Sequence, residues 1–221
     1  MKQTLNLNVG AKIGWMSLIT PFARLIVSQD SLELNASLFG CVVFSPSDVS
    51  SIEPADAPVF WGNAFRINHQ VPGYPRDIRF FSHKKPKEVM KKLEASGFLE
   101  KSKHNEKITS NKIKAKQESG RYPLKKNVAI TTILILVMLL GYDIFMFATT
   151  TEILSPFGLG FFIALSFLLL TSVLSIFIGH FRKMILKKNR GFKDIDRAMY
   201  ILIIMIFVIF STNLYLGNFH F

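Results

Sequence analysis

One carboxylate stands inside a long apolar run of the chain. Asp143 is the only charged residue between Asn127 and Thr150, and a charge at the centre of a bilayer costs at least about 2.5 kcal/mol. A charged group in such a run is therefore a candidate for function, in proton or ion passage or in contact between helices. At about 1.5 Å per residue it lies about 24 Å along its run, and Asn213 lies at a similar depth in a later run.

The depth of Asp143 leaves two roles open. We predict a hydrogen bond to Asn213, or a side chain that reaches the outer headgroups, because both partners are within reach at that depth. The alternative is a path for protons or ions lined by Asp143 and the patch Ser211–Asn213. A relay usually needs a chain of ionisable groups, and the apolar runs contain no second carboxylate.

The sequence carries none of the familiar catalytic or cofactor motifs. Nucleophile elbows, H-E-x-x-H, C-x-x-C, P-loops and dinucleotide glycine motifs are missing, and Cys41 is the single cysteine. Asp194 and Asp196 could hold a cation, but two carboxylates at a helix start are more simply partners of its positive end. We therefore predict that the protein is not an enzyme and has no catalytic residues, cofactor or metal.

The elements that position these residues are membrane helices. The chain has 221 residues, is 49% apolar with a mean hydropathy of +0.30, and has no Lys or Arg at 127–181 or 198–221. Three apolar runs fill these windows, each near the roughly 20 residues that cross a bilayer. We predict a transmembrane region over 127–221, with three helices at about 127–150, 156–181 and 198–217.

The net charge of +12 is concentrated beside the predicted helices. Residues 84–126 carry fourteen basic and five acidic side chains, and 182–197 carry seven and two. Basic residues collect in cytoplasmic loops, so we predict an inner (plasma) membrane protein with its N-terminus in the cytoplasm and its C-terminus outside. Membrane lipids are the expected partner and nucleic acid is not, because these segments lack interleaved aromatics. The candidate contacts with lipid or a partner are Lys112, Lys114, Lys116, Arg121, Lys125, Lys126, Arg182, Lys183, Lys187 and Lys188.

Small residues form a stripe on the second predicted helix. Successive residues turn by about 100°, which places them on one face, and small side chains let helices approach closely in lipid. We predict that this face is the packing seam between helices, and a membrane protein complex or homo-oligomer stays open as a partner. The stripe consists of Gly160, Ala164, Thr171, Ser175 and Gly179.

The first 99 residues have the pattern of a β-rich cytoplasmic domain. Alternating runs separated by turn residues predict seven strands, and PKEVMKKLEASG predicts an amphipathic helix that starts at Pro86 and stops at Gly97. Residues 100–126 are basic and poor in aromatics, so we predict a juxtamembrane tether. The predicted strands are Lys12–Ile19, Ala23–Ser28, Leu32–Leu38, Cys41–Ser45, Val49–Glu53, Ala64–His69 and Asp77–Phe81.

This order of elements resembles a known family. Seven antiparallel strands and one helix, with ARLIVSQDSLEL, LFGCVVFSPSDVSSIE, WGNAFRI, PRDIRFF and PKEVMKKLEASGF, resemble bacterial pleckstrin-homology-like (PH-like) domains fused to transmembrane helices. The resemblance covers about residues 11–99, and a barrel or sandwich of other topology is the alternative. It implies an α+β membrane protein with a seven-stranded PH-like head that binds lipid headgroups or protein segments.

Lipid-binding members of that family use basic residues around the loop between the first two strands. Here the expected loop, Thr20–Phe22, has only Lys12 and Arg24 beside it, which departs from the pattern. Two hypotheses result: a membrane-anchored, non-enzymatic binding or regulatory module whose head engages a partner protein or the inner membrane surface, and a small transport or channel subunit. A second basic face is predicted from Arg66, His69, Arg76 and Arg79.

Overall fold

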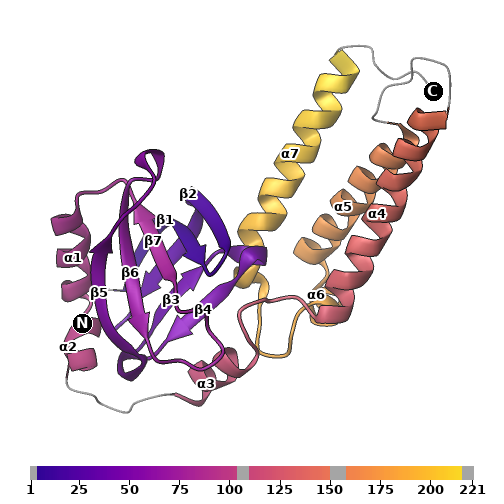
Figure 1. Cartoon of the computed structure of the whole chain (residues 1–221). Helices are drawn as coiled ribbons and strands as arrows, with labels where there is room; N and C mark the ends of the chain where they lie inside the picture. The colour runs from indigo at the N-terminus through magenta and orange to yellow at the C-terminus, as the bar shows by residue number, and fades with distance from the viewer. Residues whose placement is uncertain (1–3, 104–109, 150–157, 216–221) are drawn as a thin grey trace. The chain divides into compact units, whose positions relative to one another are not determined.

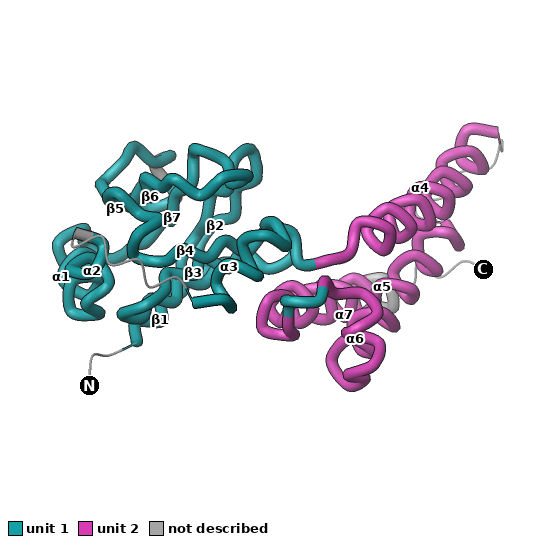
Figure 2. Tube along the Cα trace, turned by 90° about the horizontal axis from the view of Figure 1, so that it is seen from below, with its two compact units in different colours: residues 1–123, 188–190 teal, residues 124–187, 191–221 magenta. Residues whose placement is uncertain are grey.

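The computed structural model describes residues 4–103, 110–149 and 158–215. The chain divides into two compact units, which are coloured separately in Figure 2. Unit 1 comprises Met1–Pro123 together with Lys188–Arg190, and unit 2 comprises Leu124–Lys187 and Gly191–Phe221. Three residues that belong to unit 1, Lys188–Arg190, thus lie in the sequence between two segments of unit 2.

Unit 1 is built on one curled, seven-stranded antiparallel sheet (Figure 1). Its strand order is β4-β3-β2-β1-β7-β6-β5, so β4 and β5 are the edge strands. The α+β class and the seven antiparallel strands predicted from the sequence are confirmed. The strands are β1 Leu5–Ile13, β2 Met16–Val27, β3 Leu32–Asn35, β4 Cys41–Phe44, β5 Val49–Ala55, β6 Asn63–His69 and β7 Ile78–Ser82.

The core of unit 1 lies on the concave face of the sheet. Inward-facing side chains alternate along each strand, and the rings of Phe65 and Phe80 stack there with centroids 4.9 Å apart. Helix α1, Pro86–Ala95, closes the core with Val89 and Leu93, and Phe98 at the start of α2, Phe98–Lys103, is fully buried beside them. Pro86 at the first helical position and Gly97 after the last turn bound α1 as predicted.

The first two strands differ from the prediction. The sequence was expected to break at Thr20-Pro21, but β2 runs through these residues and the turn lies at Gly14, which has a φ of +67°. A bulge between Val9 and Ala11 leaves the middle of β2 outside the regular pairing, so Pro21 removes no ladder hydrogen bond. The loop between the first two strands is therefore Gly14-Trp15, and Thr20–Phe22 is not that loop.

A helix lies in the segment predicted to be a tether. Helix α3, Asn111–Glu118, begins at Ser110, whose side chain accepts a hydrogen bond from the Ile113 amide. Ile113 is buried against Cys41 and Val43 of β4. The segment can fold because the sheet supplies the apolar surface that the helix lacks.

Unit 2 consists of helices. They are α4 Lys126–Thr149, α5 Leu159–Phe177, α6 Gly179–Ile185 and α7 Asp196–Tyr215, with the short 3-10 helix η4 Phe192–Asp194 before α7. The second predicted span was extended to residue 181, but Ile178 is extended and separates α5 from α6. Helix α5 packs against both α4 and α7.

Two helices of the described chain, and not the three predicted, are long and apolar enough to cross a membrane. These are α4 and α5. Helix α7 opens on Asp196 and Arg197, and its uninterrupted apolar stretch, Ala198–Phe210, spans only about 20 Å at about 1.5 Å per residue. The prediction of a third span therefore stays a prediction.

Candidate functional site

Asp143 is held at the N-terminus of the neighbouring helix. Its side chain projects from α4 and is only 6% exposed, and its two carboxylate oxygens accept hydrogen bonds from the amides of Gly160 and Phe161 at 2.9 and 2.5 Å. Amides in the first turn of a helix have no acceptor within the helix, and the positive end of the helix dipole favours an anion. The carboxylate therefore satisfies the start of α5.

Depth along the helices predicted two other partners for Asp143, Asn213 and the outer headgroups. The side chain of Asn213 lies outside the described residues, although its backbone belongs to the last turn of α7. Of the neighbouring patch, Ser211 and Thr212 are exposed, and the Thr212 hydroxyl donates back to the carbonyls of Val208 and Ile209. The amides of α5 are partners that depth along the helices did not predict.

The contact of α4 with α5 depends on glycine. A Cβ on Gly160 would lie 2.3 Å from the Leu139 carbonyl oxygen and 2.8 Å from a carboxylate oxygen of Asp143. Close approach at small residues is the usual way in which helices associate in lipid. Gly160 therefore sets the separation of the two helices at the depth of Asp143.

The predicted small-residue stripe is partly buried. Gly160, Ala164 and Ser175 are buried, Thr171 is half-buried, and Gly179 is exposed because it starts α6 after the break at Ile178. The prediction missed Ser172, which is buried and donates to the Leu168 carbonyl at 2.7 Å.

The basic residues named from the sequence occupy different environments. Lys112 and Lys114 on α3 are exposed, as are Lys126, Lys183 and Lys188, and Lys187 is half-buried. Lys116 pairs with Glu33 at 3.0 Å, and the Arg182 guanidinium lies over the Phe192 ring at 5.3 Å. Arg121 donates to the Ile13 carbonyl at 3.2 Å and to the Tyr122 hydroxyl at 2.6 Å, which makes it part of the fold of unit 1.

The start of α4 and the end of α6 are joined. Leu124 and Leu186 form an isolated antiparallel bridge, the Lys125 amide donates to the Ile185 carbonyl at 3.0 Å, and the Lys125 side chain donates to the Lys183 carbonyl at 3.0 Å. The segment that contains α4 and α5 therefore begins and ends at the same place.

Large apolar side chains are exposed on the β1–β2 hairpin. Trp15 at its turn is 78% exposed, and Ile19 and Phe22 on β2 are 48% and 36% exposed. We call these three residues the hairpin surface. Arg121 reaches the Ile13 carbonyl beside this turn, so the hairpin surface lies at the end of unit 1 from which the chain leaves toward α4.

The second basic face predicted from the sequence is centred on an acid. Asp77 pairs with Lys12 at 2.7 Å and with Arg79 at 2.6 Å, and Arg66 lies 3.9 Å away. Burial alone would raise the pKa of Asp77, but hydrogen bonds and charge from Lys12 and Arg79 outweigh it and hold the pKa below its usual value. Arg76 is exposed, and the His69 ring contacts the Pro75 carbonyl at 2.9 Å.

The two aspartates before the third predicted span also have backbone roles. Asp194 is buried and accepts a hydrogen bond from the Gly191 amide at 2.7 Å within η4. Asp196 occupies the first turn of α7, where its side chain accepts from the Arg197 amide at 2.7 Å. Both carboxylates lie at helix starts, where anions are favoured.

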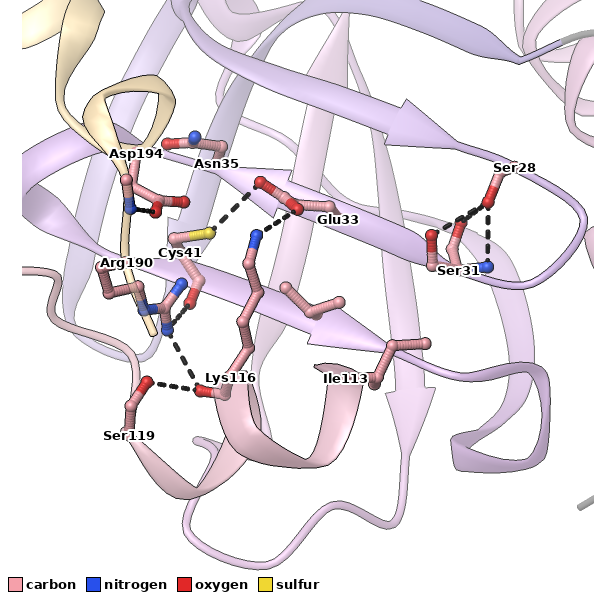
Figure 3. Close-up of polar contacts among 12 residues, drawn as sticks. Ser28, Ser31, Glu33, Asn35, Cys41, Ile113, Lys116, Ser119, Arg190 and Asp194 are labelled. Carbon is pink, nitrogen blue, oxygen red and sulfur yellow. Dashed lines mark hydrogen bonds and ion pairs between the residues drawn. The ribbon is translucent and has the colours of Figure 1, made fainter. Parts of the chain in front are cut away.

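One buried cation was missed by sequence reasoning. Arg190 is 7% exposed, and its Nη2 atom donates to the backbone carbonyls of Cys41 and Lys116 (Figure 3). The same atom also donates to the Gly120 carbonyl. Arg190 lies in a strongly basic loop, in which single residues are hard to tell apart. The one usable signal is its type, because a guanidinium suits a buried site with several acceptors better than an ammonium does.

Comparisons of the chain with protein-family models, with curated proteins and with solved structures find no match. The function proposed below therefore depends on the geometry and charge of the residues described above.

Proposed function

We propose that this chain is a membrane-anchored binding module without catalysis of its own, with a PH-like head in the cytoplasm that engages the inner membrane surface. Seven antiparallel strands followed by α1 support the PH-like assignment of the head. The observation that carries the function is the hairpin surface, whose exposed apolar side chains lie at the end of unit 1 from which the chain continues to α4.

The exposure of α4 and α5 supports their insertion in a bilayer. In the most apolar stretch of each helix, 6% of the residues of α4 and 28% of those of α5 are buried. The core helix of a water-soluble protein buries its apolar face, whereas α4 packs against α5 on one side and exposes many of its other apolar side chains, such as Ile133, Val137, Met138 and Phe145. Hydrocarbon is the solvent that accepts such a surface.

The bridge between Leu124 and Leu186 supports a topology of two crossings. Since the segment begins and ends together, α4 crosses the membrane and α5 returns. Lys125, Lys126, Arg182 and Lys183 gather at this end, which marks it as cytoplasmic by the distribution of positive charge. We propose α7 as a third span, which would put the C-terminus outside.

The hairpin surface has the composition of a membrane contact. Trp15 at the turn is suited to the headgroup region, because its ring is apolar and its N–H can still donate a hydrogen bond to water or headgroups. Tyr122 is 38% exposed and precedes the first residue of α4 by four positions in the sequence, so a second aromatic stands near the entry to the span. Lysines at the same entry would add about 1 kcal/mol each near anionic lipid.

The alternative of a transport or channel subunit has less support. Both carboxylate oxygens of Asp143 accept hydrogen bonds from α5 amides, so the residue has a structural task that needs no passing ion. The contact explains why a carboxylate is kept in the span.

Tryptophan fluorescence tests the proposed lipid contact. The chain has two tryptophans, so the variant Trp61→Phe leaves Trp15 as the only reporter in the full-length protein. In nanodiscs of anionic lipid we expect brominated acyl chains to quench Trp15 and aqueous acrylamide to quench it weakly.

The matched control is Trp15→Phe, which leaves Trp61 packed on Phe81 with ring centroids 4.9 Å apart. We expect weaker quenching of Trp61 by bromine. If acrylamide quenches the fluorescence of Trp15 and brominated acyl chains do not, the hairpin surface does not contact the bilayer.

A further inference from the structure

The outer edge of β4 is covered by later segments of unit 1. The Cys41 amide donates to the Arg121 carbonyl at 2.7 Å, and the Val43 carbonyl accepts from the Gln117 side chain at 3.0 Å. The Cys41 carbonyl accepts from Arg190 at 3.1 Å. An edge strand leaves its outward amides and carbonyls to be satisfied by something beyond the sheet, and here Gln117 of α3, Arg121 and Arg190 supply the partners.

Arg190 joins this edge to the end of α3. The same Nη2 atom that reaches Cys41 donates to the Lys116 carbonyl at 3.3 Å (Figure 3) and to the Gly120 carbonyl at 2.6 Å. Its neighbour Asn189 donates to the Ala115 carbonyl at 3.1 Å. Carbonyls at a helix C-terminus lack partners within the helix and attract cations, so this is a site at which a buried guanidinium is stabilised.

We propose that residues 188–190 are a latch that closes α3 onto β4 and that opens when the chain on either side of it moves. The latch residues are separated from the end of α6 at Ile185 and from η4 at Phe192 by one or two residues each. Each linking residue extends by at most about 3.6 Å. One or two such residues cannot absorb a large displacement of α6 or α7, so the displacement would pull on Arg190. This regulation of the head is independent of the proposed lipid contact.

Opening the latch has one direct consequence at β4. Cys41 is fully buried, and its thiol donates to a carboxylate oxygen of Glu33 at 3.6 Å beneath Lys116. Without Arg190 the end of α3 loses the cation that binds its carbonyls, so α3 should lift from the strand and admit solvent to the thiol. Cys41 is the single cysteine of the chain, so its reactivity reports the state of the latch.

Thiol labelling of the full-length protein in detergent or nanodiscs tests the proposal. We expect Ellman's reagent to modify Cys41 slowly in the wild type and about tenfold faster or more in Arg190→Gln, because a charged group's hydrogen bonds are lost. Lys183→Gln is the matched control, since it removes the same charge from an exposed position outside the latch. Equal rates in the two variants would overturn the latch.

Hydrogen exchange of the wild type provides a test that needs no variant. If the latch opens as a unit, the amides of α3 and of Cys41 share one level of protection, below that of the central strand β1. Exchange of α3 together with β1, at the free energy of global unfolding, would contradict the proposal even if Arg190→Gln failed to fold.

Discussion

Asp77 shows how one carboxylate can neutralise a basic face. Lys12, Arg66 and Arg79 all approach Asp77 within 4.0 Å. The cations that could have formed an anion-binding surface therefore share this carboxylate as their counter-ion. This arrangement favours lipid contact through the hairpin surface, because the second basic face has less free charge to offer.

The lowered pKa of Asp77 predicts acid sensitivity of unit 1. A carboxylate whose pKa falls on folding stabilises the fold above its unfolded value of 3.8, and the contribution is lost as the pH drops through the lower folded value. We expect Asp77→Asn to lower the free energy of unfolding by about 1 kcal/mol at pH 7, since the site is partly exposed.

Urea unfolding of the full chain at pH 7 and at pH 3 measures this effect. The difference between wild type and Asp77→Asn should shrink at pH 3, and the exposed Asp56→Asn should show little difference at either pH. An equal loss at both pH values would mean that Asp77 acts through its shape and not through its charge.

Asp143 was recognisable from the sequence, but its partner was not. Depth along separate apolar runs predicts a contact with Asn213, whose side chain lies outside the described residues, and the structure adds contacts with amides of the next helix that the sequence did not predict. The contact could not be predicted without the residue at which α5 begins, because only the first turn of a helix has amides without a partner in the helix. An N-terminus at Leu159 places the amides of Gly160 and Phe161 within that turn.

The pairing of α4 with α5 depends on the absence of one side chain. A Cβ on Gly160 would meet backbone of α4, whereas one on Gly141 would have nothing within 4 Å. We expect Gly160→Ala to destabilise the helix pair by about 1–3 kcal/mol, as inserted methyl groups do in packed sites, and Gly141→Ala to change stability by less than about 1 kcal/mol.

Thermal unfolding of both variants in the same detergent separates the two effects. A lower Tm for Gly160→Ala alone is the expected result. Equal Tm values for Gly160→Ala, Gly141→Ala and the wild type would show that α4 and α5 do not approach each other as described.

The sheet and the tether show what local sequence patterns can reveal about elements. Most strands were found because turn residues bound them. Thr20-Pro21 looked like a turn but lies inside β2, where the irregular pairing of β2 with β1 accommodates it. Helix α3 had visible start and stop signals in Ser110 and Gly120. Its polar composition argued against folding, since the apolar surface it needs belongs to β4.

At the scale of the molecule, the bridge between Leu124 and Leu186 predicts sidedness. In a Cys41→Ala background, Thr149→Cys should react with an impermeant maleimide added outside intact cells, because Thr149 ends α4, the proposed first crossing. Lys183→Cys should react only after the membrane is permeabilised. Labelling of Lys183→Cys from outside would contradict the two crossings of α4 and α5.

The long apolar helices α4 and α5 were predictable because composition alone identifies such runs, whereas contacts between distant segments were not. The return of residues 188–190 to unit 1 depends on three carbonyls that are contributed by β4 and by the end of α3. Nothing in a basic loop indicates which of its cations will be buried, because burial is decided by acceptors far away in the chain.

Unit 1 consists of two separate stretches of the sequence, which leave the ribosome at different times. Lys188–Arg190 follow Pro123 by about 65 residues, which a ribosome adds in roughly 3–13 s at about 5–20 residues per second. The sheet can form in that interval, but the cation that fastens α3 emerges only after both α4 and α5 have been made. A nascent chain arrested before residue 190 would therefore carry a head in which the Cys41 carbonyl and the end of α3 still lack Arg190, and completion of the head would signal that the helical hairpin has been produced.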